Sequence, residues 1–254
     1  MPSSESLETK SNISGGWAES AEAWIAEIGD RGDYGREFVL DVPMMARIKD
    51  RGYTNALDVG CGEGRFCRML QACGIRTVGI DPTEPLIQHA RLQDPQGDYR
   101  IGRAEALDFP DGYFDLVISY LSLIDIPDIG RAISEMVRVL TPKGTLLIAN
   151  LTSFTTANTG GGWRPDGDGE PRFSIDYYLQ ERAEWLSWSG IRVQNWHRPL
   201  SAYLSLLLKQ GLELRHFAEP EPQGGDPAKA ELYLRVPYFL IMEWRKPDTW
   251  RVRN

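Results

Sequence analysis

A glycine-rich segment, LDVGCGEGRF at residues 57–66, constrains the fold more than any other part of the sequence. It begins with an apolar run typical of a buried strand, and glycines follow at positions 60, 62 and 64 before a segment of helical character. Glycine is needed where a chain turns sharply and where backbone approaches a ligand closely. The pattern predicts a strand–loop–helix unit that binds a nucleotide-type cofactor. Considered alone, the loop is also compatible with a tight strand-to-helix turn without a ligand.

Two charged residues in this segment distinguish between cofactors. The dinucleotide motif G-x-G-x-x-G requires its third glycine at position 65, where this chain has Arg65. Asp58 lies just before the glycines, where a carboxylate would repel a pyrophosphate and attract a cofactor with an ammonium and a sulfonium group. The segment therefore favours S-adenosylmethionine over a nicotinamide dinucleotide.

A second apolar run, at residues 77–80, ends in Asp81 and Pro82. Asp81 follows the glycine loop by about 20 residues, the position at which a carboxylate in such folds hydrogen-bonds the ribose hydroxyl groups. Considered alone, Asp81 could equally be a helix N-terminal residue. Beside the glycine loop, we expect Asp81 and the adjacent Pro82 to contact the cofactor.

Apolar runs and amphipathic segments alternate along most of the chain. Strands are expected at residues 55–59, 77–80, 99–101, 114–119, 145–150, 212–217 and 238–244, and helices at 64–72, 85–92, around 133–140 and at 200–208. This alternation predicts an α/β fold with a doubly wound, mostly parallel sheet.

The remaining segments are expected to elaborate a single domain, residues 15–254. N-terminal helices are predicted within residues 15–52, where Trp17, Ala21 and Trp24 recur at helical spacing. Residues 152–198 include TTANTGGGWRPDGDGEP, which is too rich in glycine and polar residues for a regular element and predicts an inserted lid or cap. Residues 1–14 are mostly polar and predict a flexible tail.

Charge and hydropathy exclude several classes of protein. A net charge of −8 opposes binding to a phosphate backbone, so no nucleic-acid partner is expected. No apolar run approaches the about 20 residues that span a bilayer, and the N-terminus lacks a secretory signal, which predicts a cytoplasmic protein without a membrane partner. Cys61, Cys67 and Cys73 have no histidine at metal-ligand spacing, so we interpret all three as reduced packing residues.

Several consecutive motifs resemble those of class I methyltransferases related to the ubiquinone and menaquinone methyltransferases. They are LDVGCGEGRF, VGIDPT, GRAEALDFPDGYFDLVIS and VRVLTPKGTLLIAN, within residues 55–150. The resemblance implies a Rossmann-like sheet of seven strands in the order 3-2-1-4-5-7-6. It also implies S-adenosylmethionine as the cofactor and S-adenosylhomocysteine as the product.

The resemblance also implies which residues contact the cofactor. These are Gly60 and Gly62 under the methionine part, Asp81 at the ribose, Ala104 and Glu105 at the adenine, and Ser119 and Tyr120 at the end of the fourth strand. Many relatives carry an aspartate just before the alanine, where this chain has Arg103. Recognition of adenine is therefore expected to fall to Glu105.

Motifs outside the core resemble a branch of methyltransferases that act on small molecules. They are LSLIDIPD, HRPLSAYLSLLLKQGL and VPYFLIMEW. In that branch an arginine of the N-terminal helical region pairs with the methionine carboxylate, and Arg36 has this position. A surface ion pair of Arg36 with Asp33 or Glu37 is the alternative.

Methyl transfer from a sulfonium is an in-line displacement, so the acceptor atom must lie about 3 to 3.5 Å from the methyl group with water excluded. No metal is required, and a base is needed only when the acceptor loses a proton. His197 is the candidate base, with capping or packing as its alternative role. Asp125 follows the fourth strand, where acceptors approach, but could equally cap the next helix.

Aromatic residues concentrate in the expected lid and indicate an acceptor class. They are Trp163, Phe173, Tyr177, Tyr178, Trp185, Trp188 and Trp196. Such residues suit a planar or lipophilic small molecule, methylated on oxygen or nitrogen in preference to carbon, although ordinary packing explains each one equally well. Two alternatives stay open: a scaffold that binds the cofactor without methyl transfer, and a methyltransferase acting on protein or RNA. The sequence leaves the oligomeric state open.

Overall fold

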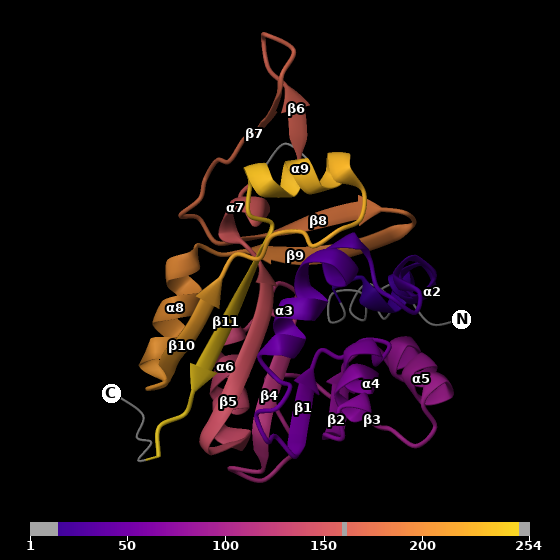
Figure 1. Ribbon diagram of the computed structural model, residues 1–254, viewed down its shortest axis with the longest axis vertical. Coiled ribbons are helices and arrows are strands. Elements are labelled where there is room, and N and C mark those ends of the chain that lie inside the picture. The colour runs from indigo at the N-terminus through magenta and orange to yellow at the C-terminus, as the bar shows by residue number, and fades with distance from the viewer. Residues whose placement is uncertain (1–14, 159–161, 249–254) are drawn as a thin grey trace, which may run out of the picture.

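A computed structural model describes residues 15–158 and 162–248, so the predicted tail at 1–14 lies outside the described residues. Its centre is a seven-stranded sheet in the order β3-β2-β1-β4-β5-β11-β10 (Figure 1). The strands are β1 (Asn55–Val59), β2 (Arg76–Asp81), β3 (Asp98–Ile101), β4 (Phe114–Tyr120), β5 (Leu140–Leu151), β10 (Glu213–Ala218) and β11 (Phe239–Arg245). The strands from β3 to β5 are parallel, and β11 runs antiparallel to β5 and β10. The predicted Rossmann-like α/β fold and strand order are confirmed.

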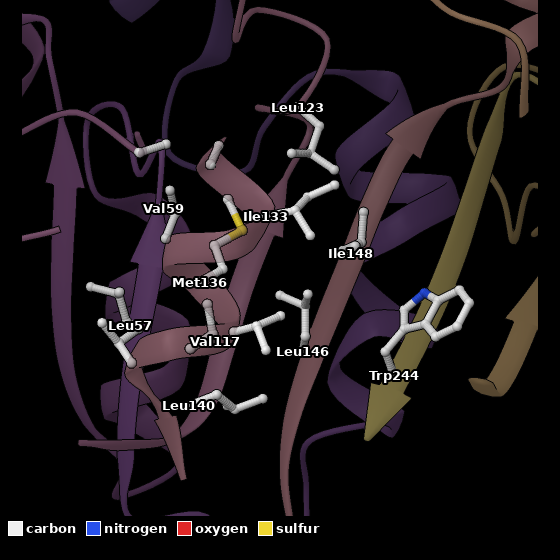
Figure 2. Packing of buried hydrophobic residues seen from close by; sticks show 14 of the residues in the cluster. Leu57, Val59, Val117, Leu123, Ile133, Met136, Leu140, Leu146, Ile148 and Trp244 are labelled. Carbon is white, nitrogen blue, oxygen red and sulfur yellow. The ribbon is translucent and has the colours of Figure 1, made fainter. Parts of the chain in front are cut away.

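Helices cover both faces of this sheet. On one face α6 (Ile129–Val139) and α8 (Leu200–Lys209) pack on strand residues, and Figure 2 shows Ile133 and Met136 of α6 over Val117 and Leu146. On the other face lie α3 (Asp41–Ala46) and α4 (Arg65–Ala72). The helix α5 (Glu84–Gln93) packs beside α4 and β3. Because side chains alternate along each strand, the two apolar faces account for the continuous apolar runs in the sequence.

The N-terminal region contains the expected helices, with a π-helical turn between them. The helix α2 (Trp17–Ile28) is followed by η1 (Arg36–Leu40), which runs directly into α3. Asp33 begins this second segment by accepting a hydrogen bond from the backbone N–H of Arg36 at 2.8 Å. π-Helical turns are rare and frequent at functional sites. Here the turn carries Arg36.

The expectation that the glycine-rich part of residues 152–198 forms neither helix nor strand is wrong. A short helix α7 (Ser153–Thr156) is followed by two antiparallel hairpins, β6 (Trp163–Pro165) with β7 (Pro171–Phe173) and β8 (Arg182–Trp188) with β9 (Ile191–His197). The turn of the second hairpin is Ser189 and Gly190, both with positive φ. Positive φ at both central residues matches the twist of a two-residue hairpin, so the polar and glycine residues make turns between strands. The helix α9 (Pro227–Arg235) was also missed.

Two elements distant in sequence, α2 and β9, lie side by side above the sheet (Figure 1). The hydroxyl of Ser20 donates to the carbonyl of Arg192 at 3.1 Å and accepts from its N–H at 2.9 Å. The backbone N–H of Gln194 donates to the carbonyl of Gly15 at 2.8 Å. Together α2 and β9 form a roof over one end of the sheet.

Cys61 and Cys67 are buried, but Cys73 is exposed, so the expectation that all three cysteines pack in the interior is wrong for Cys73. Within the described ranges, no helix is both long enough and apolar enough to cross a bilayer.

Candidate functional site

A cavity lies at the carboxyl ends of the parallel strands, between the glycine loop and the roof. Its volume is about 1120 Å³, including the space at its mouth. The carboxyl edge of a doubly wound sheet is where ligands bind in such folds. The predicted cofactor residues in its lining are Arg36, Asp58, Gly60, Gly62, Asp81, Pro82, Ala104, Glu105 and Tyr120.

The glycine loop folds as a tight connection between β1 and α4. Gly60, Gly62 and Gly64 all have positive φ, between 55° and 79°. A Cβ at Gly60 would lie 2.4 Å from the Cβ of Ser122, whereas a Cβ at Gly62 would meet nothing within 4 Å. Gly60 is therefore required by packing as well as by backbone conformation, and Gly62 by conformation alone.

Asp58 is a buried carboxylate with an unsatisfied oxygen. Its Oδ2 accepts from the Sγ of Cys67 at 3.4 Å, and its Oδ1 has no hydrogen-bond partner among the described residues. Burial raises the pKa of Asp58 to about 7, with a further contribution from the nearby negative charges of Glu63 and Asp81. A positively charged ligand group would compensate this carboxylate.

Asp81 is fixed at the end of β2 by the backbone around it. Its Oδ2 accepts from the N–H of Gly62 at 3.1 Å and its Oδ1 accepts from the N–H of Thr83 at 2.8 Å. Burial raises the pKa of Asp81, while these two hydrogen bonds act in the opposite direction. The carboxylate therefore faces the cavity in one orientation.

Arg36 lines the cavity and also makes the alternative ion pair considered from the sequence. Its Nη1 lies 2.6 Å from an oxygen of Asp33. The guanidinium lies 4.8 Å from the ring centroid of Trp24 and 5.7 Å from that of Tyr120, within the range of cation–π attraction. Arg103 and Glu105, which also line the cavity, pair with each other at 3.0 Å.

The lining also contains residues that the sequence did not assign to the site: Trp17 and Trp24 of α2, Gln194 of β9 and Glu63 of the glycine loop. Asp125, which the sequence placed where acceptors approach, lines the cavity as well. The helical stripe of tryptophans was interpreted only as a packing face. The position of Glu63 inside the glycine loop was the one sequence signal available.

Ser119 and His197, both in the described part of the chain, lie outside the cavity lining. The Oγ atoms of Ser119 and Ser122 are 2.7 Å apart, and Ser122 donates to the carbonyl of Val59, so Ser119 supports the glycine loop from behind. His197 is buried, with Nδ1 2.7 Å from Oγ1 of Thr156 and Nε2 2.9 Å from the carbonyl oxygen of Tyr178. A carbonyl only accepts, so Nε2 carries the proton and Nδ1 accepts from Thr156.

Both ring nitrogens of His197 are therefore engaged away from the cavity, and its role as a base stays a prediction that this geometry does not favour. The lid aromatics from Trp163 to Trp196 are also all described, and they lie outside the lining, where Trp17 and Trp24 supply the aromatic surface instead.

Known proteins resemble this chain in sequence and in fold. Residues 57–148 match the family model described as a methyltransferase domain. A malonyl-[acyl-carrier protein] O-methyltransferase of Yersinia pestis is 32% identical over 108 residues, 42% of this chain and 40% of that protein. A ubiquinone biosynthesis O-methyltransferase of Bradyrhizobium sp. (strain ORS 278) is 32% identical over 153 residues, 53% of this chain and 60% of that protein. This chain thus spans less than two thirds of the length of these relatives.

The structure of an S-adenosylmethionine-dependent methyltransferase from Mesorhizobium loti superimposes with a TM-score of 0.73 and 28% identity, covering 85% of this chain and 100% of that one. Residues 57–148 are thus similar to a methyltransferase domain, and the fold is the one that S-adenosylmethionine-dependent methyltransferases of known structure have. The cofactor of this domain is S-adenosylmethionine.

The residues of the methyltransferase domain fit this cofactor. The sulfonium and ammonium groups are cationic, and the unsatisfied oxygen of Asp58 with the carboxylates of Glu63 and Asp81 gives the glycine-loop end of the cavity a negative potential. Arg36 offers a guanidinium for a carboxylate at the same end. A pyrophosphate would meet three carboxylates here.

Proposed function

We propose that the protein transfers the methyl group of S-adenosylmethionine to an oxygen or nitrogen atom of a small organic acceptor. The supporting observation is the cavity itself, in which the glycine loop, Asp81 and the buried Asp58 meet an aromatic roof from α2.

Individual residues have defined parts in this proposal. Asp81 accepts hydrogen bonds from the ribose with Pro82 beside it, Ala104 and Glu105 flank the adenine, and Arg36 pairs with the methionine carboxylate. Tyr120 forms the floor below Arg36, since its ring lies beneath the guanidinium. Ser119 acts from behind, through Ser122 and Gly60.

The cofactor supplies a methyl group on a positively charged sulfur. The chain must hold the acceptor atom in line with that group and exclude water. Trp17 and Trp24 provide a roof that excludes water, and Asp58 offsets positive charge at the glycine loop. Methyl transfer by positioning and exclusion of water requires no metal.

A small acceptor is consistent with the ubiquinone-pathway relative, and net acidity disfavours a nucleic acid. A cytoplasmic location belongs to the same proposal. One observation supports a second candidate function. The structure of a [4+2]-cyclase shares this fold, with a TM-score of 0.53 and 21% identity. The fold alone therefore does not establish methyl transfer, and a protein that binds the cofactor without using its methyl group is the alternative.

Calorimetric titration with S-adenosylmethionine and with NAD tests the cofactor, using the wild-type chain, Asp81→Ala and the exposed Asp108→Ala as a matched control. We expect binding of S-adenosylmethionine alone, lost in Asp81→Ala and retained in Asp108→Ala. Release of S-adenosylhomocysteine on incubation with phenols, amines and quinones tests catalysis. Tight cofactor binding without turnover of any acceptor would favour the non-catalytic candidate.

A further inference from the structure

Asp125 is the carboxylate at which the floor and the roof of the cavity meet. It follows β4 and lines the cavity, where it is partly buried. Its Oδ1 accepts from the side-chain amide of Asn195 on β9, and the indole of Trp17 on α2 lines the same cavity. A carboxylate has about four acceptor sites on its two oxygens, so the hydrogen bond from Asn195 leaves capacity for a ligand.

The backbone on both sides of Asp125 is held by the end of β9. The buried Arg198 donates from Nη2 to the carbonyls of Ile126 and Pro127, each at 2.8 Å, and from Nη1 to Leu123 at 3.3 Å. The N–H of Trp196 donates to the carbonyl of Ile124 at 2.6 Å. A planar guanidinium that bridges carbonyls before and after Asp125 fixes the loop that carries it. The carboxylate is therefore preorganised.

The charges around the cavity select against an anionic acceptor. No arginine of the lining is left for an acceptor: Arg65 is paired with Asp41 and Arg103 with Glu105, and Arg36, beside Asp33, is assigned to the methionine carboxylate of the cofactor. Asp58, Glu63, Asp81 and Asp125 add four acidic groups to the lining, and none of them makes an ion pair within the described part of the chain. A neutral acceptor meets no such repulsion.

Accordingly, we propose that Asp125 is a catalytic residue that binds the hydroxyl group of a neutral phenolic acceptor and takes its proton during methyl transfer. This inference rests on the proposed function. The hydroxyl oxygen forms a bond to the methyl carbon while the carbon–sulfur bond breaks and its electron pair stays on sulfur. The hydroxyl proton goes to Asp125 and then to solvent.

A phenol is the acceptor class that makes use of such a base. A carboxylate acceptor has no proton to lose, and a neutral amine can attack through its lone pair before losing a proton. A phenol ring also suits the indole of Trp17, which lines the same cavity as Asp125. Burial, with a contribution from Asp81, raises the pKa of Asp125 to about 7, while Arg36 and the Trp17 and Asn195 donors act in the opposite direction. A base of this strength is matched to neutral pH.

The test compares three probes that differ in one group on the same ring: 4-methylphenol, 4-methylaniline and 4-methylbenzoate. Ligand-observed NMR at millimolar concentration measures their binding to the chain saturated with S-adenosylhomocysteine. We expect 4-methylphenol to bind at least about 10-fold more tightly than 4-methylbenzoate, which corresponds to a difference of about 1.4 kcal/mol. Equal or tighter binding of the benzoate or of the aniline would overturn the assignment of acceptor class.

Asp125→Asn, Asp125→Glu and the surface control Asp108→Asn test whether Asp125 binds the acceptor hydroxyl or only supports the fold. We expect Asp125→Asn to lose at least about 10-fold in phenol affinity, Asp125→Glu to recover part of it, and Asp108→Asn to match wild type. Calorimetry with S-adenosylmethionine on the same variants reports the cofactor site separately, and we expect unchanged affinity. If Asp125→Asn binds both the phenol and the cofactor with the affinity of the wild-type chain, the role of Asp125 is overturned. If the wild-type chain itself does not bind S-adenosylmethionine, the proposed function is overturned instead.

Discussion

The indole Nε1 of Trp24 donates to Oε2 of Glu63 at 3.1 Å, which joins α2 to the glycine loop across the cavity. Both side chains are buried, and the guanidinium of Arg36 lies over the same indole ring. The helix that forms the roof is therefore attached directly to the loop that holds the cofactor. Cofactor affinity should depend on this attachment.

Replacing Trp24 with phenylalanine tests the link, because Phe keeps an aromatic ring and removes only the N–H donor. Loss of one hydrogen bond to a charged group costs about 1.5–3 kcal/mol of stability. Because this bond fixes the roof against the glycine loop, its loss leaves the roof to be ordered when the cofactor binds, and we expect S-adenosylmethionine affinity to fall, by up to about 10-fold. Calorimetry measures the change. Trp188→Phe is the matched control, since Trp188 lies on β8 away from the cavity and is partly exposed. Equal affinities of the two variants would show that the roof does not contribute through this bond.

Asp58 predicts a pH dependence of cofactor binding. Burial raises its pKa to about 7 in the protein without cofactor, and a bound cation favours the ionised form. Binding should therefore release protons near neutral pH, and affinity should fall by up to about 10-fold between about pH 8 and pH 6. Calorimetry in buffers of different ionisation enthalpy measures the proton release. We expect Asp58→Asn to release fewer protons than wild type when the cofactor binds. Equal proton release by the two proteins would contradict the assignment of Asp58 as a source of these protons.

The same raised pKa predicts a trend in stability. The folded protein without cofactor holds a proton on Asp58 at pH values where the unfolded chain, with the ordinary carboxyl pKa, has released it. The contribution of Asp58 to the free energy of unfolding should therefore decrease as pH rises from about 4 to about 7. Denaturant unfolding across this range should show a shallower decrease for Asp58→Asn than for wild type. An identical slope in both proteins would contradict the buried, raised-pKa state of Asp58.

Gly60 and Gly62 make a matched pair of substitutions. Both have positive φ, so alanine is strained at either position, but only a Cβ at Gly60 meets another residue, at 2.4 Å from Ser122. We expect Gly62→Ala to lose about 1–2 kcal/mol of stability and Gly60→Ala to lose clearly more. Chemical denaturation measures both. Gly60→Ala combined with Ser122→Gly should recover part of the loss, and no recovery would place the strain elsewhere.

Local signals in the sequence were sufficient for the sheet and the glycine loop. The apolar run before Gly60, the carboxylate at Asp81 and the alternation of elements each depend on neighbouring residues, and the predicted strand order is confirmed. The β8–β9 hairpin was missed because the predicted lid, based on a glycine-rich stretch, was taken to continue through residues 182–197. The dipeptide Ser189-Gly190 between alternating residues was the signal that could have located it.

The roof was beyond local reasoning because it arises from contacts between distant segments. The tryptophans of α2 have the spacing of an ordinary packing face, and only the docking of α2 against β9 turns Trp17 and Trp24 toward the cavity. His197 was chosen because it lies at a lid-to-helix junction, but the hydrogen bonds to Thr156 and Tyr178 direct its ring elsewhere. Side-chain direction at a junction depends on such partners, which sequence spacing does not encode.

Arg65, the residue that distinguishes this loop from a dinucleotide-binding loop, has a structural role that predicts a large effect on stability. Its Nη1 and Nη2 each lie 2.8 Å from an oxygen of Asp41, and the hydroxyl of Tyr120 also donates to Asp41 at 2.8 Å. Arg65→Met would leave the carboxylate of Asp41 with its charge uncompensated, which costs about 3–5 kcal/mol for a buried pair. Arg100→Met removes an exposed pair with Asp98 and should cost less than about 1 kcal/mol. Denaturant unfolding compares them, and Arg65→Met with Asp41→Leu should be more stable than Arg65→Met alone. If the double variant is the less stable, uncompensated charge on Asp41 is not the cause of the loss.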